Sequence, residues 1–456
     1  MSGARSLLAA SCLVAALVAA ALAGSAGPAG AAALYSCSGS APGDEAHLQP
    51  LIDAGGAIVL QGPLACAGNY VADGVTVSIT GAGPGVTMDG RGTGSIFRLD
   101  DATVTLTNLT LTHGSGSGPD EPGDPSGANG GAVSMGDSTL TVDRCRIVGN
   151  RAHDQGGGIH AAESTVTVVD STVSNNTSRE GGGGIDADDD VDLSVTRSTF
   201  NGNATGPHGG GIELFDGTLT VTDSTISGNR LTNTSDFRSG GGIWTGLSVV
   251  DLTRSTVSGN SSPEYGGGIG FSGGPGSSMT LHDSIVSGNG ATVGGGGIRS
   301  DAYYGDAVLV VDGSTIAGNT TGQSGGGVDA VGMHGFTASV SLAGSTVAAN
   351  RTGARGVGGG IDGYVDPSGG ALTITIASSR IGARPLHAND GNEAGFGGGI
   401  AANGDNGPAS IDLDPGTVLV ANVATFDGGG IFTRNGASLA AGPGVLMLLN
   451  RPNDVG

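Results

Sequence analysis

The chain has 456 residues, of which 92 are glycine, and its 41 acidic and 18 basic residues give a formal net charge of −23. This charge excludes nucleic acid and anionic membrane surfaces as partners, because both are bound through positive charge. A Gly-rich composition alone is compatible with disorder, but Val, Ile and Leu recur at fixed intervals, which favours an ordered repeat protein.

Residues 1–33 have the pattern of a secretory signal peptide. Arg5 precedes a continuous apolar run, and the small residues that follow offer a cleavage site between Ala26 and Ala33. No later segment contains the ~20 apolar residues that a membrane-spanning helix needs. We therefore expect a secreted, extracellular protein, either free or associated with the cell surface, that is a monomer and not an integral membrane protein.

The rest of the chain divides into three parts by composition. Residues 34–113 are expected to form an N-terminal cap and the first irregular coils, and residues 114–129 a loop rich in Gly, Pro and Asp. Residues 130–456 are repeats in which the motif "GG[GA][IV]" returns 26 to 39 residues after the previous copy. The hydrophobic residue closing each copy is Val133, Ile159, Ile185, Ile212, Ile243, Ile269, Ile298, Val328, Ile361, Ile400 or Ile431.

A second landmark, a hydrophobic residue three positions before an Asn, follows nearly every copy. The segment "SRIGAR" breaks this pattern, because Arg384 stands where Asn is expected. Between the landmarks the sequence alternates with period two, as in "TLTVTD", where Leu219 and Val221 lie on one face. Each unit thus predicts three short strands separated by Gly, Asp and Asn corners.

One such unit cannot bury its apolar face alone, so successive units must stack about one strand spacing, ~4.8 Å, apart. The result is an all-β, single-stranded parallel β-helix, a solenoid of roughly 13 coils. The alternative, a β-propeller, needs ~40–45 residues per blade, which is more than most of the intervals here. We expect the glycines to supply positive φ or close approach at the corners, and the recurring Asn to take a left-handed bend and hydrogen-bond between coils.

A column of charges also follows the repeat. Arg144, Asp170, Arg197, Asp223, Arg254 and Asp283 occupy equivalent positions and alternate in sign. Stacked at one strand spacing, each interior member would lie between two opposite charges. We interpret the column as a surface device that fixes the register of the coils.

The motifs resemble a known family. "GGAV" at 130–133 and "FNGN" at 200–203 are similar to the GGA[IVL] and FxxN pair of the polymorphic outer-membrane protein repeat, and the N-terminal part resembles secreted β-helix proteins of the pectin-lyase-like superfamily. The resemblance covers about residues 46–456 and implies a right-handed helix with a short N-terminal capping helix. It also places Cys37 and Cys66 in the cap, where we expect a disulfide. Cys145 holds the position that Ser occupies in later coils, two residues before the inward Ile147, so we expect a buried and unreactive thiol.

The residue after each landmark hydrophobe is expected to point outward and form an exposed column. His160, Asp186 and Glu213 would then lie ~5 Å apart on neighbouring coils, which is the carboxylate separation of retaining glycosidases. These three are the catalytic candidates. The candidates for ligand binding share this face and are Trp244, Phe215, Asp188, Arg299 and Asp301. The alternative is that the face is an ordinary solvated surface.

The stretch "DADDDVD" clusters acidic oxygens that could bind Ca²⁺, although its spacing is not that of an EF-hand. The metal candidates are Asp186, Asp188, Asp189, Asp190 and Asp192, and no other cofactor is expected. We interpret the protein as a non-catalytic β-helix that binds an extracellular polysaccharide or a cell-surface component for adhesion or glycan contact. The alternative is a polysaccharide lyase or glycoside hydrolase.

Overall fold

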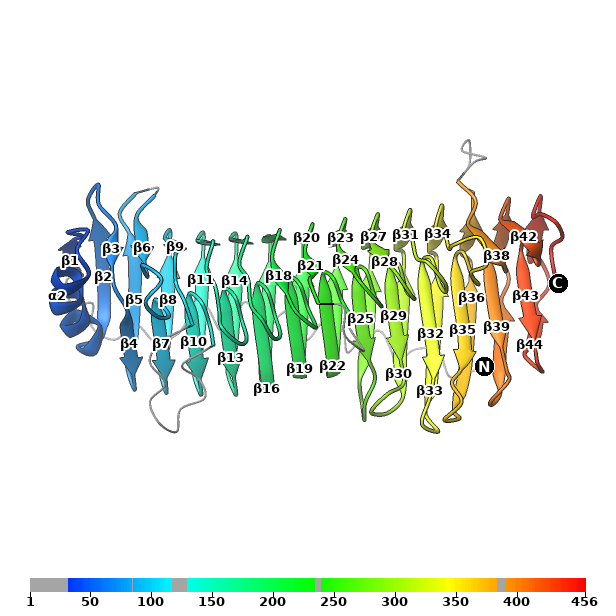
Figure 1. Cartoon of the computed structure of the whole chain (residues 1–456), viewed down its shortest axis with the longest axis horizontal. Helices are drawn as coiled ribbons and strands as arrows, with labels where there is room; N and C mark the ends of the chain where they lie inside the picture. The colour runs from blue at the N-terminus through cyan, green and yellow to red at the C-terminus, as the bar shows by residue number, and fades with distance from the viewer. Residues whose placement is uncertain (1–31, 84, 117–128, 234–238, 384–389) are drawn as a thin grey trace, which may run out of the picture.

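The protein is a right-handed parallel β-solenoid, as predicted, with one short helix at its N-terminal end (Figure 1). The computed structural model describes residues 32–83, 85–116, 129–233, 239–383 and 390–456. The expected signal peptide up to residue 31 and Arg384 lie outside the described residues. One of the sheets contains a single strand from each of 14 turns, slightly more than the roughly 13 coils expected.

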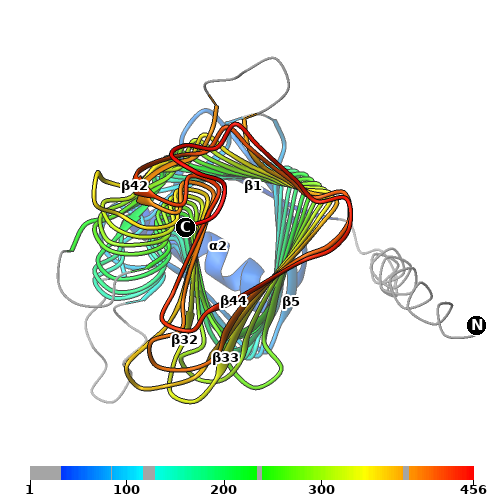
Figure 2. The ribbon, with the colours of Figure 1, turned by 90° about the vertical axis from the view of Figure 1, so that its right-hand side faces the viewer.

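Each turn contributes three strand positions, and the end-on view shows the turns superimposed along the axis (Figure 2). The second strands run from β1 (Ala33–Ser36) and β2 (Gly56–Gln61) through β5 (Thr76–Gly81) to β44 (Ser438–Ala441), and the third strands from β3 (Cys66–Ala67) to β45 (Leu446–Leu448). The first strands carry the candidate site. They include β10 (Val133–Gly136), β13 (Ile159–Ala162), β16 (Ile185–Thr196), β19 (Ile212–Thr222), β22 (Ile243–Thr253), β25 (Ile269–Ser272), β29 (Ile298–Asp301), β32 (Val328–Gly332), β35 (Ile361–Val365), β39 (Ile400–Asn403) and β43 (Ile431–Arg434).

The period-two pattern sets the register of the stack. Leu219 on β19 pairs in parallel with Leu193 on β16 and with Val250 on β22, and all three side chains are buried. In β16, β19 and β22 the first and second strands merge into one strand of 11 or 12 residues. Because like residues stack on like, the apolar core is continuous through the solenoid.

The glycines act at the corners as expected. Gly209 has a φ of +59°, a conformation that is strained for residues with a Cβ. The next glycine, Gly210, approaches the following coil so closely that a Cβ would lie 2.2 Å from the carbonyl oxygen of Gly241. One glycine of the motif therefore supplies the turn and the next supplies the close approach.

The repeated Asn forms a buried ladder, but it does not take the left-handed bend. That bend falls on the preceding residue, such as Gly228 with a φ of +63° or Asn175 with a φ of +54°. The Asn that follows points inward, where Asn229 donates from Nδ2 to Oδ1 of Asn260 at 3.0 Å and is fully buried. Asn392 restores the ladder in the coil that contains Arg384.

The N-terminal end is closed by α2 (Ala41–Asp53), which confirms the capping helix. Leu48 and Ile52 of this helix are buried against the first coils. Cys37 and Cys66 form the expected disulfide. Cys145 is buried, as predicted, and burial raises the pKa of its thiol to about 11.

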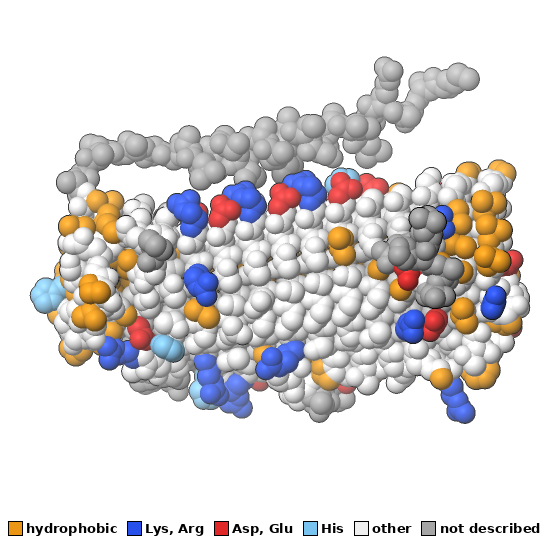
Figure 3. Space-filling model, turned by 90° about the horizontal axis from the view of Figure 1, so that it is seen from above, with side chains coloured by type: hydrophobic (Ala, Val, Ile, Leu, Met, Phe, Trp, Pro, Cys, Tyr) orange, Lys and Arg blue, Asp and Glu red, His pale blue; other side chains and the backbone are white. Residues whose placement is uncertain are grey.

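The alternating charges form ion pairs on the surface. Asp170 pairs with Arg197 at 2.7 Å and Asp223 with Arg254 at 2.8 Å. A line of side chains that alternate in sign is visible along one long edge (Figure 3). Within the described residues, no helix is long and apolar enough to cross a membrane.

Candidate functional site

The outward column of the first strands is not an exposed face, contrary to expectation. Asp186 is fully buried and Trp244 is only 8% exposed. The connection from each third strand to the next first strand folds back over the column, and we call each such connection an arch (Figure 2). Gly181 of one arch lies so close that a Cβ there would be 2.3 Å from Oδ1 of Asp186. The period-two alternation correctly predicts that these side chains point away from the core, but it does not show which segments of the chain cover them.

The arches are themselves held in parallel register. Short strands β18 (Ala204–Thr205), β21 (Arg230–Leu231), β24 (Ser261–Ser262) and β28 (Gly290–Ala291) form a small sheet of their own. Single parallel bridges continue the row, for example from Gly290 to Thr320, and a second row of bridges in the arches includes the one from Ser239 to Tyr265. The site is therefore a covered space between the first-strand sheet and the row of arches.

The three catalytic candidates do come together, but beneath an arch. His160 Nδ1 lies 2.9 Å from Oδ2 of Asp186, and the backbone N–H of Gly182 donates to Oε2 of Glu213 at 3.0 Å. Burial raises the pKa of Asp186 and of Glu213 well above the usual carboxyl range, and the neighbouring acids add to this. Burial also lowers the pKa of His160. Because they are buried, these groups do not face an open substrate site.

The five metal candidates are divided among three places, so one ion cannot bind them all. Asp188 lies beside Asp186, where it accepts a hydrogen bond from Gln155 Nε2 at 2.9 Å. Asp192 accepts a hydrogen bond from Thr218 on the outer surface. Asp189 and Asp190 border a separate hollow of 380 Å³. The other residues that line this hollow are Asp137, Glu163 and Asp216.

Trp244 lies in an aromatic cluster at the mouth of a larger cavity of 460 Å³. Its ring stacks on Phe215 with 1° between the planes and on His208 with centroids 4.6 Å apart. Tyr304 meets Phe215 edge to face, and Tyr303 packs on Tyr304. Both tyrosines are 43% exposed, so they present ring surface to the solvent side of the cavity.

Charged and hydrogen-bonding groups form the inner wall of the same cavity. Arg299 pairs with Asp329, lies 3.6 Å from Asp301, and has its guanidinium 4.7 Å from the ring centre of Tyr265. Burial alone would lower the pKa of Arg299, but Tyr364, Asp329 and Asp301 together raise it well above its usual value. The guanidinium therefore stays charged, and its charge is balanced by carboxylates on its own and the next coil.

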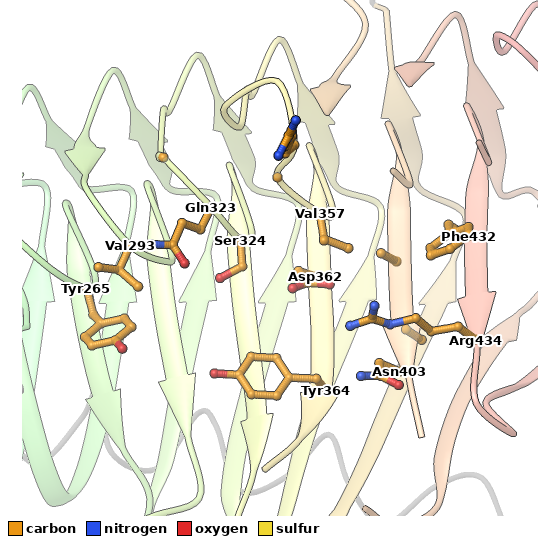
Figure 4. A pocket seen from close by; sticks show the side chains of 15 residues that line it. Tyr265, Val293, Gln323, Ser324, Val357, Asp362, Tyr364, Asn403, Phe432 and Arg434 are labelled. Carbon is orange, nitrogen blue, oxygen red and sulfur yellow. The ribbon is translucent and has the colours of Figure 1, made fainter. Parts of the chain in front are cut away.

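A second cavity, of 540 Å³, adjoins the first along the solenoid axis and shares Tyr265 and Tyr364 with it. Arg434 reaches across from β43 toward Asp362 on β35, beside Asn403 (Figure 4). The two cavities thus form one groove that follows the stack of first strands from Trp244 toward the C-terminal coils.

Of the residues that the sequence identified, Trp244, Arg299 and Asp301 line one cavity. Phe215 does not line it, but packs against Trp244 and Tyr304 beside it. Asp188 lies apart from it, with His160 and Asp186. The tyrosines were missed, although four of the six in the chain line this cavity together with the single tryptophan; they are Tyr265, Tyr303, Tyr304 and Tyr364. Aromatic residues make up only 4% of the chain, so the few tyrosines were the sequence signal that could have pointed to this site.

Comparisons with known proteins agree with the fold. Residues 77–248 match the family model described as a right-handed β-helix region. A search of curated proteins found no match. Among solved structures, the chain is similar to the catalytic unit of a thermostable GH87 α-1,3-glucanase from Streptomyces thermodiastaticus strain HF3-3. The two are 12% identical, with a TM-score of 0.36, over 95% of this chain and 70% of that chain. A likeness at this level carries no argument about activity.

Proposed function

We propose that this protein is a secreted β-helix that binds a neutral polysaccharide in the groove between its first strands and its arches. The observation that carries the proposal is the gathering of four of six tyrosines and the single tryptophan around one cavity. Ligand sites are concave, lined by aromatic side chains, and contain a few placed polar groups. The cavity beside Trp244 has each of these properties.

The charge of the groove favours a neutral ligand over an acidic one. The protein carries a formal charge of −23, which repels a polyanion. The positive charge of Arg299 is already balanced by Asp301 and Asp329. Sugar hydroxyls can both donate to these carboxylates and accept from the guanidinium, whereas a uronate would add a third negative charge to the same wall.

The length of the groove favours a chain rather than a monosaccharide. From Trp244 to Phe432 the outward column passes through six coil steps of ~4.8 Å, or about 29 Å. Tyr265 and Tyr364 border both cavities, so a ligand bound in one continues into the other. An extended oligosaccharide parallel to the solenoid axis fits this arrangement.

Two features of the sequence support display outside the cell. The signal-like residues 1–33 favour export, and the "GGAV" and "FNGN" motifs resemble the polymorphic outer-membrane protein repeat. Adhesion to a glycan-bearing surface would follow from binding along an extended groove.

Hydrolysis of the bound glycan is the second candidate function, and Asp301 is the observation that favours it. Burial raises the pKa of Asp301, which is a property that the general acid of a glycosidase needs. Unlike Asp186 and Glu213, Asp301 lines the wall of the open cavity. The acid would have to act with a second carboxyl in the groove, for which Asp362 is placed one cavity further along.

A glycan array followed by product analysis tests both candidates. We expect the protein to bind neutral oligosaccharides, and Tyr304→Ala to weaken binding while keeping the fold. Phe426→Ala is the matched control, because Phe426 is 52% exposed and lies outside both cavities. New reducing ends that disappear in Asp301→Asn would establish hydrolysis. Failure to bind any neutral glycan, or equal loss in both aromatic variants, would contradict the proposal.

A further inference from the structure

The cluster beneath the arch at residues 181–182 has the composition of a metal site. One imidazole and two carboxylates, from His160, Asp186 and Asp188, can each direct one ligand atom so that all three lie within 4.8 Å of one another. These residues come from adjacent first strands in parallel register, β13 and β16. The backbone therefore holds the set rigidly, which suits a preformed site.

His160 hydrogen-bonds one oxygen of Asp186, but the hydrogen bonding of the cluster is incomplete. Oδ1 of Asp186 is buried and receives no hydrogen bond from the described residues. The carboxyls of Asp186 and Asp188 come within 4.8 Å of each other, a separation at which two buried, ionised carboxylates repel unless a proton or a cation lies between them. Glu213 adds a third buried carboxyl under the same arch, since its Oε2 lies close to Gly181.

No arginine compensates this charge. Among the ion pairs of the described residues, His160 is the partner of Asp186, and none joins an arginine to Asp186, Asp188 or Glu213. In the groove, by contrast, Arg299 compensates the charge of Asp301 and Asp329. Buried carboxylates are normally paired with a cation or bound to a metal.

We propose that His160, Asp186 and Asp188 bind a divalent transition-metal ion of the Zn²⁺ or Mn²⁺ type. The imidazole decides the class, because Ca²⁺ is bound by oxygen ligands alone whereas nitrogen–carboxylate sets suit first-row transition metals. The 2.9 Å between His160 Nδ1 and Asp186 Oδ2 is close to the ~3.0 Å between adjacent ligands of an octahedral ion at about 2.1 Å, and somewhat shorter than the ~3.4 Å of a tetrahedral one. The ion would link two coils and neutralise the buried charge.

The test is titration of the chelator-treated full-length protein with Mn²⁺, Zn²⁺ and Ca²⁺, followed by calorimetry and by Mn²⁺ electron paramagnetic resonance. We expect one equivalent of Mn²⁺ or Zn²⁺ to bind, to raise the Tm, and to be preferred over Ca²⁺. Asp188→Asn should weaken binding by at least about tenfold, because even loss of an outer partner of a metal ligand costs 10–100-fold. His160→Gln should weaken metal binding to a similar extent, and it replaces the first variant in the test if Asp188→Asn fails to fold.

Asp190→Asn is the matched control, since Asp190 belongs to the exposed acidic hollow two residues away. It should bind the metal as the unmodified protein does. The proposal is overturned if no stoichiometric binding of Mn²⁺ or Zn²⁺ is seen, or if Ca²⁺ is preferred. It is also overturned if Asp190→Asn loses binding while Asp188→Asn and His160→Gln retain it, which would move the site to the exposed rim.

Discussion

Replacement of one Asn of the ladder should destabilise the solenoid far more than replacement of an exposed Asn. The side chain of Asn229 makes four buried hydrogen bonds: it donates to Phe200 O at 3.1 Å and to Asn260 Oδ1 at 3.0 Å, and it accepts from Asn203 N at 2.9 Å and Asn203 Nδ2 at 3.0 Å. In Asn229→Ala all four are lost and the backbone N–H of Asn203 is left buried without an acceptor.

At roughly 0.5–1.5 kcal/mol net for each of the four hydrogen bonds, with about 1–3 kcal/mol for the orphaned buried donor, the loss should be about 3–9 kcal/mol. The measurement is chemical unfolding followed by circular dichroism. Asn201→Ala is the control, because Asn201 lies in the preceding coil, two residues before Asn203 of the ladder, and has an exposed side chain. A loss for Asn229→Ala below about 1 kcal/mol, or one equal to that of the control, would refute the ladder as a source of stability.

Three further predictions concern charge and covalent links. With a chelator present, Glu213→Gln should raise the Tm at about pH 8 and leave it unchanged near pH 4. The reason is that the pKa of Glu213 is raised in the folded state, which contributes stability at low pH that is lost as the pH rises. A lower Tm of the variant at about pH 8 would contradict this. Cys37→Ser should lower the free energy of unfolding by about 3–4 kcal/mol in the chain-entropy model, measured as a lower denaturant midpoint. The unmodified protein should show the same lower midpoint only after reduction with dithiothreitol. Asp223→Arg should lower the Tm slightly, with the deficit shrinking in high salt, since Asp223 is exposed and its pairing with Arg254 is screened; a large, salt-independent loss would argue against a surface register role.

The fold could be predicted because the determinants lie in local, repeated patterns. Period two places Leu219 inward, and stacking follows because a single coil cannot bury that face. We predicted that the recurring Asn would link the coils, but not that its side chain would point inward. The left-handed bend that we expected at the Asn lies at the preceding residue instead, for example at Gly228.

The site was harder to predict because it depends on what the irregular segments cover. Nothing in the alternation around Asp186 indicates that Gly181 lies over it. Tyr303 and Tyr304 follow β29 in a turn, where no period applies, yet they supply the most exposed aromatic surface of the cavity. The Asn ladder likewise continues at Asn392, although the repeat pattern expects Asn at position 384. This shift depends on an insertion, and the length of an insertion does not follow from the repeat.

The central claim, that a neutral glycan binds beside Trp244, can be tested by fluorescence because Trp244 is the only tryptophan in the chain. A neutral oligosaccharide that binds by calorimetry should shift or quench the emission saturably, with the same dissociation constant in both measurements, because Trp244 lines the cavity. Calorimetric binding of such a glycan with unchanged Trp244 emission would place the ligand elsewhere and contradict the account.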